Sequence, residues 1–356
     1  MRMRSRSGRN HREPREALEW LDVAIQSRLL AEGTDAFRLA DSSRLWVERF
    51  GSAGMISHQF ALPEGLIEET RKRLGSGPLF VRQLVHGPGS ANRPVRVGGS
   101  GTETTFSAHE AGLTFEVDFS SGYSCGLFLD QRANRARLKA LAPRRVLNCF
   151  AYTCSFSVVA AAAGADTTSV DLARAALSRG KRNFERNGLP TQGHRFLEDD
   201  ARDALPRLAR RGEKFDAIIL DPPTFARGRG GRIFRVEDHI ENLLRMALEC
   251  ATEDAHILIS TNCPRLDAPR LLRRIHAAAD KPLCATPQPP PEDFPAGRAA
   301  STVWISHCDN SAHPQHPPRK KPSLDHPRAP LPTDAQTNPL PAWPSSGFPG
   351  GTAPPN

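Results

Sequence analysis

The sequence predicts an α/β protein: a Rossmann-like three-layer sandwich with a mostly parallel, roughly seven-stranded sheet, preceded by a small N-terminal α+β domain. Between residues 145 and 308, short apolar runs alternate with segments of helical periodicity. Repeated βαβ units of this kind place helices on both faces of a parallel sheet. Residues 14–108 lack that alternation, which indicates a separate and less regular fold.

The N-terminal part is expected to hold a disordered arm and then the small domain. Residues 1–13 are rich in Arg and Ser and offer little to pack, so we expect a solvated basic arm that could touch phosphate. In the domain that follows, over 14–108, nothing indicates catalysis. Its expected elements are helices over 17–30 and 64–74 and strands over 45–47 and 79–81.

The main domain is expected over residues 109–308. It begins with an expected strand over 113–119, in which apolar and polar residues alternate, and a turn at 120–122. Further strands are expected at 146–150, 167–171, 194–199, 215–221, 256–261 and 301–307, joined by helices that include 236–251 and 267–279. Residues 309–356 contain 13 prolines and no apolar periodicity, so we expect a disordered tail.

Composition limits the class of protein. A formal net charge of +9 favours a polyanionic partner such as nucleic acid. The basic N-terminus leads into no apolar signal segment, and no apolar run is long enough to span a membrane, so we expect a cytoplasmic protein without a membrane partner. Seven cysteines without metal-ligand spacing suit a reducing compartment and predict no metal site.

The carboxyl ends of the expected strands carry the functional candidates, because an open parallel sheet binds its ligand there. Residues 148–155 join the first strand to a helix without the G-x-G-x-x-G pattern of a dinucleotide site. A ligand without phosphate fits this turn better. The second strand ends in Asp171, where a carboxylate accepts hydrogen bonds from the ribose hydroxyls of an adenosine ligand. Capping of the following helix is the competing interpretation of Asp171.

Two further strand ends carry acidic residues. Residues 198–200 offer a carboxylate either to an adenine amino group or to a helix cap. Residues 221–225 read Asp-Pro-Pro-Thr-Phe, and two prolines after a buried strand fix the backbone and leave outward carbonyls. Beside the ring of Phe225, this end predicts a platform for a planar base rather than a mere turn. Cys263, after the fifth strand, is either a nucleophile or a small buried filler.

The segment from about Gly112 to Cys263 resembles the class I S-adenosylmethionine-dependent methyltransferases that modify large-subunit ribosomal RNA. Within them it is similar to the 23S rRNA cytosine-C5 methyltransferases and to the methyltransferase half of the fused 23S rRNA guanine methyltransferases. The match covers roughly half the chain. It is carried by residues 122–132 (GYSCGLFLDQR), 150–153 (FAYT), 169–171 (SVD) and 221–225 (DPPTF).

The resemblance implies S-adenosyl-L-methionine as the cofactor and an RNA partner, 23S rRNA or a large-subunit precursor. It implies that the turn after the first strand holds the methionine part, Asp171 the ribose and Asp200 the adenine, while Gln131 approaches from the preceding loop. The implied cofactor-binding set is Gln131, Phe150, Ala151, Tyr152, Thr153, Ser155, Asp171, Leu172, Asp200, Ala201 and Asp221. Cys154 stands where relatives often have Gly, which narrows the backbone conformations and is expected to crowd the cofactor.

Two target chemistries remain open. In one, Asp221 and the Pro222 carbonyl orient a guanine nitrogen while Phe225 stacks on the base. In the other, the Cys263 thiolate attacks C6 of cytosine and C5 then takes the methyl group. Rival interpretations are a methyltransferase acting on a protein or small molecule, and a non-catalytic nucleic-acid-binding protein with a degenerate cofactor fold.

Overall fold

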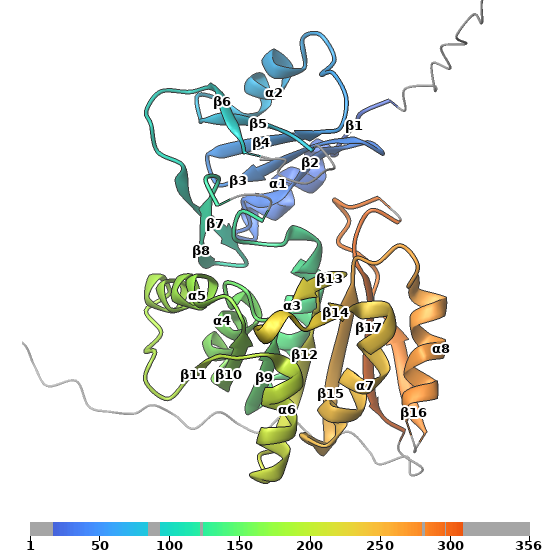
Figure 1. Cartoon of the computed structure of the whole chain (residues 1–356). Helices are drawn as coiled ribbons and strands as arrows, with labels where there is room; N and C mark the ends of the chain where they lie inside the picture. The colour runs from blue at the N-terminus through green and yellow to red at the C-terminus, as the bar shows by residue number, and fades with distance from the viewer. Residues whose placement is uncertain (1–16, 85–92, 122–123, 280–281, 296, 309–356) are drawn as a thin grey trace, which may run out of the picture. The chain divides into compact units, whose positions relative to one another are not determined.

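The sheet expected in the main domain is present in the computed structural model, with strands in the order β11-β10-β9-β12-β15-β17-β16 (Figure 1). Its pairs are parallel from β11 to β15, and β17 runs antiparallel to β15 and β16. The strands are β9 (Arg145–Cys149), β10 (Asp166–Asp171), β11 (Arg195–Glu198), β12 (Phe215–Leu220), β15 (Ala251–Thr261), β16 (Leu283–Pro287) and β17 (Ser301–His307). The predicted mostly parallel, seven-stranded sheet is confirmed.

Both faces of this sheet are buried, which explains why a central strand such as β12 is apolar apart from Asp216 near its start. Ile218 and Leu220 pack with α6 (Ala201–Arg210), α7 (Val236–Leu248) and α8 (Ala268–Ala278). Ala217 and Ile219, which point the other way, pack with α3 (Arg132–Leu141) and α4 (Ser155–Ala162). The helix α5 (Arg174–Arg186) lies beside α4 and β10. The three-layer sandwich is therefore confirmed.

The structure describes residues 17–84, 93–121, 124–279, 282–295 and 297–308, all within one unit that ends at Asp309. The predicted arm at 1–13 and tail at 309–356 lie outside the described residues. Within those ranges no helix has both the length and the apolar character needed to cross a membrane. A disulfide joins Cys284 on β16 to Cys308, a pairing that the sequence does not predict.

The N-terminal part forms an α+β fold around a six-stranded sheet in the order β1 to β6. The strands are β1 (Glu19–Trp20), β2 (Ala36–Asp41), β3 (Leu45–Phe50), β4 (Ala53–His58), β5 (Leu79–Gln83) and β6 (Val95–Gly98), with helices α1 (Val23–Ala31) and α2 (Leu66–Leu74). The sequence predicts α2, β3 and β5. It also predicts α1, but it begins that helix at residue 17 and so includes β1. It misses β2 and β4 because each is buried along its whole length and shows no polar alternation.

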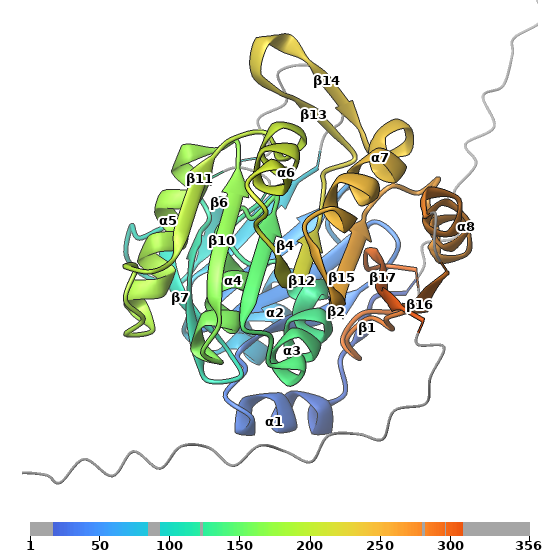
Figure 2. The same cartoon turned by 90° about the horizontal axis from the view of Figure 1, so that it is seen from below.

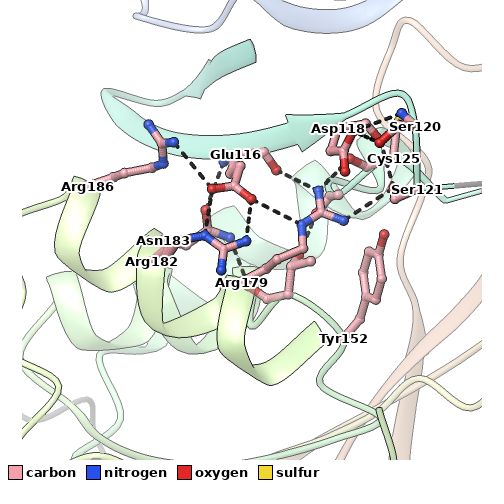
Figure 3. Close-up of polar contacts among 12 residues, drawn as sticks. Glu116, Asp118, Ser120, Ser121, Cys125, Tyr152, Arg179, Arg182, Asn183 and Arg186 are labelled. Atoms are coloured by element: carbon pink, nitrogen blue, oxygen red, sulfur yellow. Dashed lines mark hydrogen bonds and ion pairs between the residues drawn. The ribbon is translucent and has the colours of Figure 1, made fainter. Parts of the chain in front are cut away.

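A two-stranded ribbon, β7 (Thr105–Glu110) and β8 (Leu113–Asp118), follows that sheet and contains the strand expected over 113–119. The proposed domain boundary between residues 108 and 109 falls within β7, and the division into domains stays a prediction. The ribbon packs on α5, where the amide of Glu116 donates to Asn183 Oδ1 over 2.8 Å. Hydrogen bonds from Arg182 and then Arg186 on α5, with the charge of Arg179, lower the pKa of Glu116 to about 2 (Figure 3).

Glu116→Gln is expected to destabilise the protein by about 1–2 kcal/mol at pH 7, because the folded state holds this carboxylate ionised between arginines that are themselves partly exposed. The stabilisation is complete above the ordinary pKa of 4.5 and is lost as the pH falls towards 2. Urea unfolding between pH 3 and 7 measures it. Glu185→Gln, on the same helix, is the control, and an equal effect of both substitutions would contradict the assignment.

Candidate functional site

A cavity of about 540 Å³ lies at the carboxyl ends of β9, β10 and β12, within the size range of small-molecule sites. It is bordered by strand ends and by the segment that precedes α3. Of the residues that the sequence singles out, it is lined by Gln131, Phe150, Ala151, Tyr152, Ser155, Asp171, Leu172, Ala201, Asp221 and Pro222. The expectation that the ligand binds at the carboxyl ends of the strands therefore leads to a cavity whose wall contains most of the candidate residues.

The turn between β9 and α4 forms one wall, and its backbone is unusual. Phe150, Tyr152 and Cys154 have positive φ angles of 59°, 48° and 61°. Side-chain-bearing residues rarely adopt this region, and such strain gathers at binding sites. The amide of Ala151 donates to the Val170 carbonyl over 3.0 Å, which ties the turn to β10.

Cys154 does not crowd the cavity, so that expectation is wrong. Its side chain is fully buried and does not line the cavity. A Cβ placed on Gly180 of α5 would lie 2.4 Å from Cys154 Sγ and 2.9 Å from its Cβ. The thiol thus occupies space that Gly180 leaves empty.

Asp171 ends β10 and faces the cavity while it holds the turn. One carboxylate oxygen accepts from the amide of Tyr152 over 2.7 Å, and the other accepts from the amide of Ala173 over 2.8 Å. Each oxygen keeps a further lone pair. Burial raises the pKa of this carboxyl. The two interpretations of Asp171 are therefore compatible, since the group that organises the backbone also borders the ligand space.

Asp200 is placed differently from its expected role. It is the N-cap of α6, accepts from the amide of Arg202 over 2.9 Å, and forms ion pairs with Arg202 and Arg232. It does not line the cavity, whereas its neighbours Asp199 and Ala201 do. The helix cap and the arginines occupy the Asp200 carboxylate. Asp199 also accepts from the amide of Asp200 over 2.9 Å and pairs with Arg207 over 2.6 Å, but it is the acidic residue of this strand end that borders the cavity.

Asp221, at the end of β12, belongs to a buried hydrogen-bonded chain. Asn134 donates to Gln131 Oε1 over 2.8 Å, and Gln131 donates to Ser260 Oγ over 2.6 Å. The Ser260 hydroxyl in turn hydrogen-bonds Asp221. Burial, with a further contribution from the charge of Asp130, raises the pKa of Asp221 to about 6. This carboxyl can therefore exchange a proton near neutral pH.

Besides Asp200, three expected residues lie away from the cavity wall. Phe225 is 48% exposed on β13 (Phe225–Arg227), in a hairpin with β14 (Ile233–Arg235) that projects from the rest of the molecule in Figure 2. Thr153 is buried and donates its hydroxyl to the Gly126 carbonyl. Cys263 is 3% exposed, and its thiol donates to Glu237 Oε1 over 3.0 Å. Burial and the Glu237 carboxylate raise the pKa of this thiol.

The cavity wall also contains Ser124, Phe128, Asp130 and Asn262, to which the sequence assigns no role. The first three belong to the segment over 122–132, whose pattern carries the family resemblance. That pattern could therefore have identified them as site residues. Arg179 fixes this segment by donating to the Cys125 carbonyl over 2.9 Å and to Ser121 Oγ over 3.3 Å (Figure 3). Tyr152 adds a hydrogen bond of 2.7 Å to the Ser124 carbonyl.

Comparison with known proteins agrees with this geometry. A family model described as S-adenosylmethionine-dependent methyltransferase matches residues 75–302. Ribosomal RNA large subunit methyltransferase I of Aeromonas salmonicida (strain A449) is 35% identical over 173 residues, 48% of this chain and 43% of the relative. Ribosomal RNA large subunit methyltransferase K/L of Legionella pneumophila (strain Paris) is 38% identical over 186 residues, 51% of this chain and 24% of the relative. The chain thus spans less than half the length of these relatives.

Solved structures of methyltransferases also match this chain. A putative methyltransferase in complex with SAH superposes with a TM-score of 0.71 at 26% identity, covering 79% of this chain and 78% of the other. The SAM-dependent methyltransferase from Agrobacterium tumefaciens has a TM-score of 0.62 at 22% identity, covering 77% and 90%, and shares the fold.

Gly180→Ala is expected to destabilise the protein by about 1–3 kcal/mol, because the new methyl group meets a buried thiol that has no room to move. Cys154→Gly in the same chain removes the clash and suits the positive φ angle, so the double variant should recover most of the loss. Chemical denaturation of the single and double variants checks this. A double variant no more stable than Gly180→Ala would show that the two side chains do not compete for this space.

Proposed function

The chain belongs to the S-adenosylmethionine-dependent methyltransferase family, and we propose that it methylates a base of large-subunit ribosomal RNA. The observation that carries the proposal is the cavity at the strand ends, where Asp171 and Asp221 lie in one wall. The names of the curated relatives support the RNA class of substrate. The net charge of +9 suits 23S rRNA or its precursor as partner, and a substrate of this class would place the protein in the cytoplasm.

The residues present fit the cofactor. Phe150, Ala151, Tyr152 and Ser155 would hold its methionine part, and Asp171 with Leu172 would hold the ribose, since each Asp171 oxygen has a lone pair left after one backbone hydrogen bond. Asp199 and Ala201 would face the adenine in place of Asp200. Gln131, tied to Ser260, would border the methyl end. The bound cofactor supplies an electrophilic methyl group carried on a sulfonium.

The protein's own residues then have to align a nucleophile and handle one proton. Asp221 and the Pro222 carbonyl would accept hydrogen bonds from an amino or ring N–H of the base. The Asp221 carboxylate would take up the proton that the nitrogen loses as it is methylated, for which its pKa of about 6 is suited. The partly enclosed wall would keep water from the reacting atoms.

The surroundings of Cys263 support a nitrogen target rather than cytosine C5. Its thiol lies outside the cavity wall and already donates to Glu237. Its raised pKa further disfavours the thiolate that an attack on C6 requires. A nitrogen of guanine needs no covalent help from the protein, so we take guanine as the target base.

The proposal is tested by transfer of labelled methyl from the cofactor to total RNA stripped of protein, followed by nucleoside analysis. Methylated guanosine is expected in the wild type and, undiminished, in Cys263→Ala. Methylated cytidine that disappears in that variant would overturn the nitrogen target. Label found in protein alone would overturn RNA as substrate.

Asp221→Asn is expected to lower kcat by about a hundredfold or more, because the proton acceptor is lost. The same substitution should stabilise the cofactor-free protein by about 1–3 kcal/mol at pH 7.5, since burial disfavours the charged carboxylate in the folded state. The folded pKa is raised from 3.8 to about 6, so wild-type stability falls as the pH rises through that window, and the gain vanishes below about pH 4.

Methyl transfer and urea unfolding of one preparation measure both effects of Asp221→Asn. Asp254→Asn, an exposed carboxylate on β15, is the matched control and should change neither. A variant that loses activity without any gain in stability at pH 7.5 would contradict a half-buried, ionised Asp221.

A further inference from the structure

A second cavity, of about 350 Å³, adjoins the first. The two cavities share four lining residues: Ser124, Phe128, Asp130 and Asn262. The other side of the second cavity comes from the N-terminal sheet, with Arg38 and Asp41 on β2, Trp46 and Glu48 on β3, and Arg82 on β5. A ligand there would therefore meet the cofactor cavity at the Phe128–Asp130 segment.

The wall from the N-terminal sheet is unusually polar for buried structure. Arg38 lies 5.3 Å from the centroid of the Trp46 ring and 4.2 Å from that of Phe294, and it pairs with Asp41 and Glu48. Arg38 is 9% exposed and Asp41 is 5% exposed. Buried charges of this kind are costly unless they are paired or used by a ligand.

Two atoms of this wall are left without hydrogen bonds among the described residues. Arg38 Nε, a donor, and Asp41 Oδ1, an acceptor, are both buried and make none. The Arg298 guanidinium lies 3.5 Å from Asp41 Oδ1 as an ion pair. Both atoms are buried, so they keep the wall polar without reaching the ligand space. The groups that a ligand can reach include the Trp46 and Phe128 rings and the Asp130 carboxyl, a combination that suits the face and the edge of a base.

Asp130 marks the junction of the two cavities. One of its carboxylate oxygens accepts from the amide of Ala300 over 3.1 Å, and burial raises the pKa of the group. Phe128 beside it is 37% exposed, with its ring 5.5 Å from that of Tyr152. A ligand that extends from one cavity into the other would therefore contact the Asp130 carboxyl and the partly exposed Phe128 ring.

We propose that the second cavity receives the target nucleoside, a guanosine splayed out of single-stranded RNA, with Trp46 and Phe128 available to its rings. Asp130 would accept from the ring N–H, and the amino group would extend to Asp221 in the first cavity. This inference rests on the proposed function and names where its substrate binds. Guanine fits because adjacent N1–H and N2–H₂ donors suit a carboxylate, while O6 and N7 suit guanidinium donors. Phe225 lies outside both cavities and does not compete for this role.

The test is calorimetric titration of the full chain, saturated with S-adenosylhomocysteine, with guanosine 5′-monophosphate. Saturable binding is expected, with cytidine 5′-monophosphate binding more weakly. Trp46→Leu should weaken binding of the guanosine nucleotide about tenfold, because a ring that stacks on the base is lost. Arg298→Gln, at the rim, should weaken it about fivefold. Trp20→Leu on β1 and Arg73→Gln on α2 remove the same residue types outside both cavities, and they should leave the affinity unchanged.

Binding of S-adenosylhomocysteine reports whether each variant is folded, and if Trp46→Leu fails this check, Arg298→Gln decides. Absence of saturable binding, equal affinity of wild type and both cavity variants, or equal affinity for the cytidine nucleotide would overturn the inference. Methyl transfer to ribosomal RNA is measured on the same preparations. If guanosine monophosphate binds and its affinity depends on Trp46, but no methyl group is transferred to ribosomal RNA, the proposed function is wrong and the cavity assignment stands. If methyl transfer occurs without such binding, the proposed function stands and the cavity assignment is wrong.

Discussion

The ion pair between Arg135 and Glu110 is the interaction on which both cavities depend. Two hydrogen bonds of 2.6 Å join the guanidinium of Arg135 to the carboxylate of Glu110, and the side chains are 1% and 4% exposed. Arg135 also donates to the Phe128 carbonyl over 2.8 Å and approaches Ser155 Oγ at 3.4 Å. The Arg135 side chain therefore connects the β7–β8 ribbon, the segment at Phe128 between the two cavities, and the start of α4. Such a pair gives little net stability, but it specifies one arrangement.

The strand ends could be predicted from the sequence because a parallel sheet brings them to one edge whatever the rest of the chain does. Asp171, Asp221 and the turn after β9 lie in the cavity wall for this reason. The choice between Asp199 and Asp200 could not be predicted, since it depends on which carboxylate caps α6 and which arginines lie nearby. Both residues occupy the same strand end, and only the local helix geometry separates them.

Other parts of the site depend on contacts between distant segments. Cys263 follows its strand at the expected place, but Glu237, on a different helix, takes up its thiol hydrogen. Phe225 directly follows the Asp-Pro-Pro-Thr segment, yet β13 pairs with β14 and carries the ring outwards. The second cavity combines Arg38 on β2 with Asp130, almost a hundred residues later, so no local pattern marks it. The buried strands β2 and β4 escape prediction for the same lack of polar alternation.

Asp130 at the junction and Asp221 in the first cavity also indicate an order of events. Asp130 raises the pKa of Asp221, so the empty site disfavours two negative charges close together. A cation bound in the first cavity would lower the pKa of Asp221 and favour its ionised form, while a base N–H donor at Asp130 would favour ionisation of that group. Each ligand would therefore stabilise the ionised form of the carboxyl that it faces, and the electrostatic cost of an ionised Asp221 in the free protein would be relieved as the cavities fill. The cost of burying these carboxyls in the free protein is thus offset by the ligands that need them.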